Sequence, residues 1–196
     1  MFERLDAQLA AFAPRLHDDL GVPPASSGRV ASAVASDLRA LGPRLVTVLD
    51  GDDPVGFSAR FEELIAFQSF MDATASLTGE PAVSRARVIV QNYVCFVYLK
   101  EAWLERLARE LPSSSVAAMC AVFLTTGRVR AFRNAVSHAR WRYSSDFSAL
   151  EYWDRASADR KAPLQQFRVD QLELGFWQGL TRGVGYVAAE LRRAAG

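Results

Sequence analysis

Apolar residues recur every three or four positions along most of the chain, which is the spacing of an amphipathic helix. In the first region, residues 1–50, one such series is marked by Phe2, Leu5, Leu9 and Phe12. A second series is marked by Val30, Val34, Leu38, Leu41 and Leu45. We expect Pro14 to end or kink the first helix and Gly42-Pro43 to kink the second, because proline removes a helical hydrogen bond.

The strongest helical patterns lie between residues 57 and 141, and we expect them to form the core bundle. An amphipathic helix is predicted from Phe57 to Leu77, and a longer, more apolar one over Ser84–Leu111. A third helix is predicted over Ser115–Trp141, with Gly127 inside it. The link between the last two is short, so these two helices should lie antiparallel.

The pattern changes after residue 141. The segments LEYWDR and QQFRVDQLEL have strand character and flank the polar stretch ASADRKAP, which predicts a β-hairpin over residues 148–172. A closing helix is predicted over residues 172–194, interrupted early by its four glycines. With no internal repeat, residues 1–196 are predicted to form a single, mainly α-helical domain with one small β element.

Composition is that of a globular protein, with 50% hydrophobic and 23% charged residues. No apolar run reaches the roughly 18 residues of a membrane span, and the N-terminus has no signal-peptide core. We therefore expect a cytoplasmic protein without a membrane partner. The net charge of +1 argues against nonspecific wrapping of nucleic acid, but a local arginine cluster remains compatible with it.

Two further residue types restrict the chemistry. Cys95 and Cys120 each lie in an apolar helical stretch, which favours buried free thiols over a disulfide or a catalytic thiol. No histidine or cysteine cluster has the spacing of metal ligands. We expect neither a bound metal nor a cofactor.

The segment from Arg128 to Tyr143 combines five arginines with His138, one of only two histidines in the chain. Histidine exchanges a proton near neutral pH, and the planar guanidinium of arginine suits phosphate. Together they suit metal-free RNA cleavage, in which a ribose 2′-hydroxyl attacks the adjacent phosphate. The spacing is not ideal, because Arg133 lies about 140° from His138 around a regular helix.

The string Arg133-Asn134-Ala135-Val136-Ser137-His138 resembles the R-x4-6-H motif of the HEPN superfamily. The resemblance implies an antiparallel four-helix bundle core and a metal-independent endoribonuclease, with Arg133 and His138 catalytic and Asn134 assisting. It also implies a homodimer in which two motifs face one cleft, with RNA as substrate. Related bacterial proteins act as toxins or in phage defence, so an antitoxin or the product of a neighbouring gene is a further expected partner.

Four more residues are candidates for substrate binding, namely Arg130, Arg140, Trp141 and Tyr143. The arginines would contact phosphates and the aromatic rings would stack on a base. A solvated arginine face and aromatic packing over the helix end are the alternatives, and His138 could merely favour the helix dipole. For the whole chain, the alternatives are a non-catalytic HEPN-fold binding module and a plain helical interaction protein.

Overall fold

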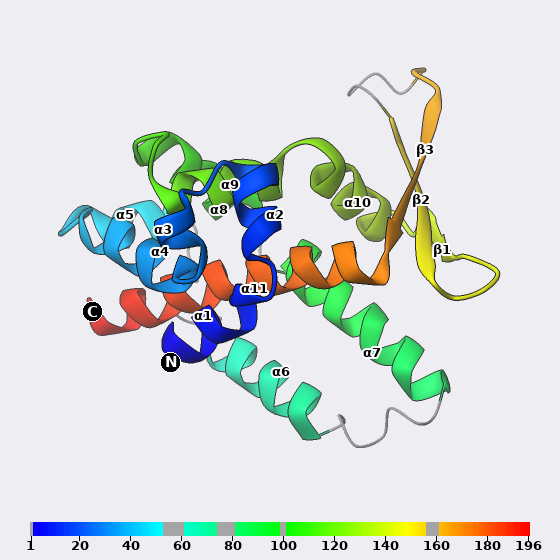
Figure 1. The fold of residues 1–196 in the computed structure, drawn as a ribbon, viewed down its shortest axis with the longest axis horizontal. Coiled ribbons are helices and arrows are strands. Elements are labelled where there is room, and N and C mark those ends of the chain that lie inside the picture. Colours follow the sequence, from blue (N-terminus) through cyan, green and yellow to red (C-terminus); the bar gives the residue numbers. More distant parts are fainter. Residues whose placement is uncertain (1, 53–60, 74–80, 99–100, 156–160) are drawn as a thin grey trace.

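The structure, a computed structural model, describes residues 2–52, 61–73, 81–98, 101–155 and 161–196. Within these residues the chain is mainly helical with a small antiparallel sheet, which confirms the predicted class (Figure 1). The elements before the sheet are α1 (Phe2–Ala10), α2 (Ala13–Leu20), α3 (Pro24–Ser27), α4 (Val30–Arg39), α5 (Arg44–Asp50), α6 (Phe61–Ala73), α7 (Pro81–Tyr93), the π-helical turn η3 (Val94–Tyr98), α8 (Glu101–Glu110), α9 (Val116–Thr125) and α10 (Gly127–Ser137). The remaining elements are β1 (Trp141–Tyr143), β2 (Ala149–Arg155), β3 (Leu164–Asp170) and α11 (Gln171–Ala194).

The N-terminal region, residues 2–52, forms five short helices where the apolar pattern predicted two. Pro14 lies in the first turn of α2, where its missing N–H costs nothing, so the first predicted helix ends before it. Gly42, at a φ of 55°, and Pro43 separate α4 from α5. The predicted loop after α2 contains the single turn of α3.

The closing helix α11 is the central element of the core, with α1, α4 and α9 packed against it (Figure 1). The predicted interruption by glycines is wrong, because α11 is continuous. One of these glycines makes room for α1: a Cβ at Gly183 would lie only 3.0 Å from Cδ1 of Leu9, whereas one at Gly179 would lie at an ordinary contact distance of 3.7 Å from Cδ2. Glycine therefore allows a close helix–helix approach here.

The helix predicted over residues 84–111 is helical wherever the structure describes it up to Glu110, but its middle is not regular α-helix. The α-helical hydrogen bonding of α7 changes to a π-helical turn in η3, and residues 99 and 100 lie outside the described residues. A π turn contains an extra residue, and here the sequence neighbours Cys95 and Phe96 are both buried.

The helix predicted over residues 115–141 is two helices. The hydroxyls of Thr125 and Thr126 donate to the carbonyls of Ala121 and Val122 at 2.8 and 2.7 Å, and Thr126 has extended backbone. Gly127 follows at a φ of +52°, a left-handed conformation that favours glycine. The chain therefore leaves the helix between α9 and α10, and α10 ends four residues before the predicted boundary.

The predicted hairpin is present as the antiparallel pair β2 and β3, in which Leu150 lies opposite Val169. The sequence pattern missed β1, which adds to the other edge of β2 with Trp141 opposite Tyr152. The sheet order is β1-β2-β3. Residue 141, the predicted end of the helix, and the two residues after it therefore form a strand.

An aromatic cluster holds α10 between the sheet and α11. The ring centroid of Phe132 lies 5.2 Å from that of Phe96, 5.1 Å from that of Tyr152 and 5.8 Å from that of Trp177. The hydroxyl of Tyr152 also donates to the carbonyl of Arg128 at 3.2 Å. Because Phe132 of α10 contacts rings from three other elements, η3, β2 and α11, the position of α10 is tightly defined.

Cys95 and Cys120 are free and buried, which confirms the prediction for both thiols. Burial raises the pKa of each to about 12. A neutral, enclosed thiol is a poor nucleophile, so neither cysteine is a candidate for catalysis.

Candidate functional site

The C-terminal end of α10 turns sharply into the sheet. The backbone N–H of Arg140 donates to the carbonyl of Ala135 at 2.8 Å, and that of Ala139 donates to the carbonyl of Val136 at 3.3 Å. This pair of bonds is the Schellman closure of a helix. Ala139 adopts a φ of +53°, a conformation that is common for glycine but rare for residues with a side chain. His138 occupies the cap position at this turn.

The His138 side chain is exposed, and its imidazole makes no hydrogen bond or ion pair with any residue that the structure describes. Its backbone N–H donates to the carbonyl of Asn134 at 3.1 Å, so the backbone is anchored while the ring is not. An exposed imidazole beside a helix end is available to a ligand for proton transfer.

A short polar chain links α10 to the sheet. Nη2 of Arg133 donates to Oδ1 of Asn134 at 3.0 Å, and Nδ2 of Asn134 donates to Oδ2 of Asp154 at 3.0 Å. All three side chains are half-buried. Burial lowers the pKa of Arg133, and the negative charge of Asp154 opposes that shift. The guanidinium is therefore a cation whose orientation the amide and the carboxylate set.

Of the three residues linked by these hydrogen bonds, Asp154 is the one that the sequence did not indicate. It lies on β2, twenty residues after Asn134, and nothing in the local pattern joins the two positions. The alternation of LEYWDR does place Asp154 on the same face as the buried Tyr152, which is the face against α10. A third group that orients the arginine could have been sought on that face.

The four predicted substrate-binding residues fall into different environments. Arg130 is exposed on α10, whereas Arg140, Trp141 and Tyr143 are half-buried. The rings of Trp141 and Tyr143 meet edge to face with centroids 5.5 Å apart. The hydroxyl of Tyr143 donates to the carbonyl of Arg85 at 3.2 Å, and burial raises its pKa. These contacts tie both rings to the protein, and a role for them in stacking on a base stays a prediction.

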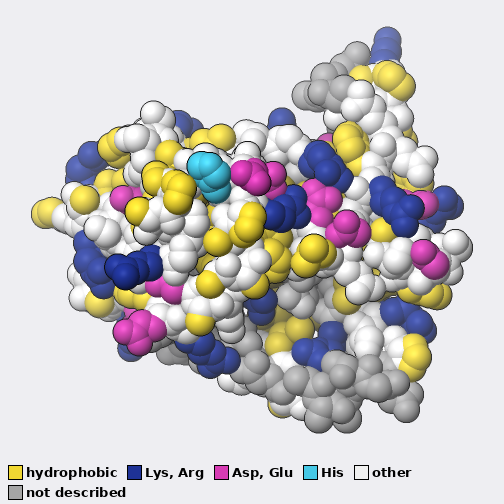
Figure 2. Space-filling view, viewed as in Figure 1, with side chains coloured by type: hydrophobic (Ala, Val, Ile, Leu, Met, Phe, Trp, Pro, Cys, Tyr) yellow, Lys and Arg dark blue, Asp and Glu magenta, His cyan; other side chains and the backbone are white. Residues whose placement is uncertain are grey.

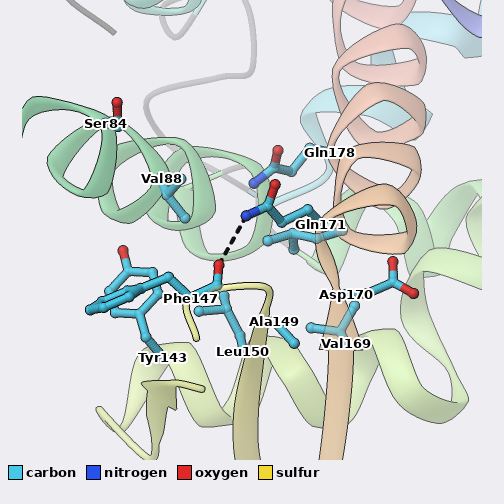
Figure 3. A pocket seen from close by; sticks show the side chains of 11 residues that line it. Ser84, Val88, Tyr143, Phe147, Ala149, Leu150, Val169, Asp170, Gln171 and Gln178 are labelled. Atoms are coloured by element: carbon cyan, nitrogen blue, oxygen red, sulfur yellow. Dashed lines mark hydrogen bonds between the residues drawn. The ribbon is translucent and has the colours of Figure 1, made fainter. Parts of the chain in front are cut away.

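A cavity of about 320 Å³ lies between α7, the sheet and the beginning of α11 (Figure 3). Tyr143 contributes to its wall, but Arg133, Asn134 and His138 do not. At one side of it, Nε2 of Gln171 donates to the carbonyl of Phe147 at 2.9 Å. The expectation that Arg133 and His138 share one cleft therefore stays a prediction.

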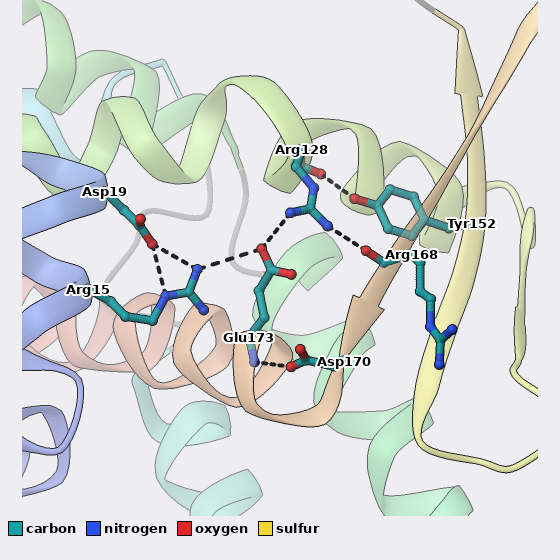
Figure 4. A network of polar contacts seen from close by, with 7 residues as sticks. All are labelled: Arg15, Asp19, Arg128, Tyr152, Arg168, Asp170 and Glu173. Atoms are coloured by element: carbon teal, nitrogen blue, oxygen red, sulfur yellow. Dashed lines mark hydrogen bonds and ion pairs between the residues drawn. The ribbon is translucent and has the colours of Figure 1, made fainter.

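A second cavity, of about 300 Å³, lies at the opposite end of α10 and is bordered by charged side chains (Figure 4). Glu173 of α11 accepts from Nη1 of Arg128 at 2.9 Å and lies 3.7 Å from Nη2 of Arg15. Arg15 in turn pairs with Asp19 at 2.8 Å. Two cations and two anions neutralise one another, so this network connects α2, α10 and α11 without excess charge.

Neither a metal centre nor a membrane span is found in the described part of the chain. No group of three or more His, Cys, Asp or Glu side chains there is arranged to hold a metal ion. None of its helices combines the length and the apolar character needed to cross a bilayer.

Comparison with known proteins does not assign the chain to a family. No family model matches the sequence, and neither the curated proteins nor the solved structures give a significant match.

Proposed function

We propose that this protein is a metal-independent endoribonuclease of the HEPN type. His138 acts as general base or acid, Arg133 stabilises the charge that develops on the phosphate, and Asn134 orients Arg133. The observation that carries the proposal is the contrast within one short motif. The imidazole of His138 is exposed at the helix end, while Arg133 is held through Asn134 and Asp154.

The reaction forms a bond between the 2′-oxygen and phosphorus and breaks the bond from phosphorus to the 5′-oxygen. One proton leaves the 2′-hydroxyl, and one is given to the departing 5′-oxygen. The cation of Arg133 stabilises the pentavalent phosphorane between these steps. The products are a 2′,3′-cyclic phosphate and a 5′-hydroxyl.

The proposal includes a four-helix HEPN core and a homodimer. One motif supplies one histidine, whereas the reaction has two proton transfers, so a two-fold axis that brings two copies of His138 to one cleft completes the site. Arg130 and Arg140 would then contact the flanking phosphates of the RNA. A cytoplasmic toxin or phage-defence effector, controlled by an antitoxin or neighbouring gene product, is the biological role that goes with this activity.

The test is cleavage of a labelled RNA by the purified protein in excess EDTA. We expect cleavage to persist, the new ends to carry a cyclic phosphate, and DNA of the same sequence to survive because it lacks the 2′-hydroxyl. Light scattering at micromolar concentration should give the mass of a dimer. Loss of activity on chelation, or equal cleavage of DNA, would contradict the mechanism.

A second candidate function is a HEPN-fold binding module without catalysis. It is favoured by the state of Arg133, whose guanidinium is half-buried and already donates to Asn134. Such a module would bind RNA with the same residues but leave it intact. Intact RNA recovered from a stable complex, under conditions where the dimer is present, would favour this alternative.

A further inference from the structure

The outward face of the sheet carries a row of residues that the sequence analysis did not connect. The face against α10 holds Leu150, Tyr152 and Val169, all buried. Side chains alternate across a strand, so their neighbours in sequence point away from α10. We call this side of the sheet the outer face. Its basic, aromatic and amide residues are Arg140, Arg142, Trp153, Arg155, Gln166 and Arg168.

The pairing register arranges these residues around Trp153. Gln166 lies directly opposite it on β3. On the other side, the N–H of Trp153 donates to the carbonyl of Arg140 at 2.9 Å, which extends the β1–β2 ladder by one residue. Arg142 is diagonal to Trp153, with its guanidinium carbon 5.2 Å from the ring centroid. The sheet therefore sets an aromatic ring among arginines.

Charge on the outer face is mainly positive. Among the strand positions that point this way, Glu151 lies between Arg142 and Arg168 and pairs with Arg142 at 2.7 Å. Asp170, at the end of β3, is committed to the cap of α11 through the N–H of Glu173. Four arginines thus face two carboxylates, and Figure 2 shows basic side chains over the sheet at the right of the view.

The arginines are accessible to a ligand. Arg142 and Arg168 are exposed, and the half-buried side chain of Arg140 makes no hydrogen bond or ion pair with the residues that the structure describes. The guanidinium of Arg168 donates from Nη2 to Oγ of Ser148 at 3.2 Å, in an exposed hydrogen bond. Trp153 is half-buried beside Arg142. An anionic strand would find both charge and a stacking surface here.

The outer face is also continuous with the candidate catalytic residue. Arg140 follows His138 by two positions, and the turn at Ala139 joins the end of α10 directly to β1. On the opposite side of β2, Asp154 holds Asn134. Arg140 is therefore the outer-face residue that lies nearest in sequence to the exposed His138.

We infer that the outer face binds single-stranded RNA, with a base stacked on Trp153 and phosphates contacted by Arg140, Arg142 and Arg168. The inference rests on the proposed function for the identity of the nucleic acid, and it deepens that function by naming the form of the substrate. A flat aromatic and cationic surface suits unpaired bases, which can stack on a side chain. The paired bases of an RNA duplex cannot.

Binding is measured apart from cleavage by using the His138→Ala protein and a fluorescein-labelled RNA of twelve nucleotides in fluorescence anisotropy. Trp153→Ala should weaken binding about tenfold or more, whereas Trp153→Phe, which keeps a ring, should bind nearly as the parent does. Arg168→Gln should reduce the slope of log K against log salt by about 0.7, the value for one phosphate contact on a single strand. Arg109→Gln, a change at an exposed arginine on α8, is the matched control and should alter neither quantity.

The outcomes separate this inference from the proposed function. If the wild-type protein cleaves RNA but Trp153→Ala and Arg168→Gln bind as the parent does, the outer face is not the binding surface and the inference is wrong. If no cleavage is found but binding depends on Trp153 and Arg168, the inference stands and the nuclease proposal fails. Duplex RNA of the same sequence bound as tightly as the single strand, or binding of an acidic peptide in place of RNA, would also overturn it.

Discussion

The two ends of α10 have similar sequence composition but different electrostatics. At the N-terminal end, Arg128 is paired with Glu173, which also approaches Arg15, and Arg15 is paired with Asp19. At the C-terminal end, the side chains of His138 and Arg140 have no such partner within the described residues. The density of arginine therefore does not mark a functional site. What differs is whether the protein supplies the counter-charge itself or leaves it to a ligand.

The largest expected effect comes from substitution of His138, with His17 as the control. His138→Ala should lower the rate of RNA cleavage by roughly 10²–10⁴-fold, because it removes the group proposed to transfer the proton. The melting temperature should hardly change, since His138 is exposed. His17→Ala is the control, because Nδ1 of His17 lies 3.2 Å from the carbonyl of Val22 at the end of α2, in a structural contact. Equal loss of activity in both variants would contradict a catalytic role for His138.

A matched pair of arginine substitutions tests the comparison directly. Arg133→Lys keeps the charge but loses the planar fork that Asn134 orients, so cleavage should fall by roughly 10²-fold, as when one transition-state donor is removed. Arg128→Lys should leave cleavage by the folded protein unchanged, because Arg128 is part of the neutral network. The measurement is the rate of cleavage per folded molecule, with circular dichroism as the check on folding. If Arg128→Lys lowered cleavage and Arg133→Lys did not, the site would lie at the N-terminal end of α10 and the proposal would be wrong.

The anchoring of α10 to the sheet should appear in alkaline stability. Burial raises the pKa of Tyr152 to about 12 from an ordinary value near 10. Because the folded state holds this proton more tightly than the unfolded state, the stabilisation is complete below pH 10 and is lost as the pH rises towards 12. Tyr152→Phe should remove part of this loss of stability at high pH. At neutral pH it should lower the free energy of unfolding by about 1 kcal/mol, because the variant lacks the hydrogen bond to the Arg128 carbonyl. Chemical denaturation at a series of pH values measures both.

The smallest effect concerns the turn beside His138. Ala139→Gly should stabilise the fold by about 0.5–1 kcal/mol, because the gain from removing a left-handed alanine exceeds the entropy cost of glycine. Urea denaturation measures this difference. Cleavage should be unchanged or slightly reduced, since glycine lets the end of α10 move. A destabilised Ala139→Gly protein would show that the positive φ carries no strain.

Sequence reasoning located the elements with strong local signals. The hairpin of β2 and β3 followed from alternating residues around a polar turn, and the end of the first helix followed from Pro14. The break at Gly127 was missed because a glycine inside an apolar helical pattern is compatible with a continuous helix. The strand β1 was missed because three residues carry no period of their own and pair only through β2.

The same limit applies to the candidate site. The string from Arg133 to His138 is local and could be read directly, as could the neighbouring Arg140. Asp154 could not be assigned, because it reaches Asn134 only after the sheet packs on α10. The glycines of α11 were interpreted as helix breakers since propensity alone disfavours them, and only the packing of Leu9 gives them a role.

The central position of α11 also determines when the fold can form during synthesis. Helices α1, α4 and α9 pack on a segment that follows them by many tens of residues in the chain. A nascent chain that ends before residue 171 lacks the surface on which these helices pack, including the close approach of Leu9 to Gly183. We expect such chains to expose apolar side chains and to depend on chaperones. The complete core, and with it the placement of α10 against the sheet, is then acquired only after the ribosome has released residues 171–194.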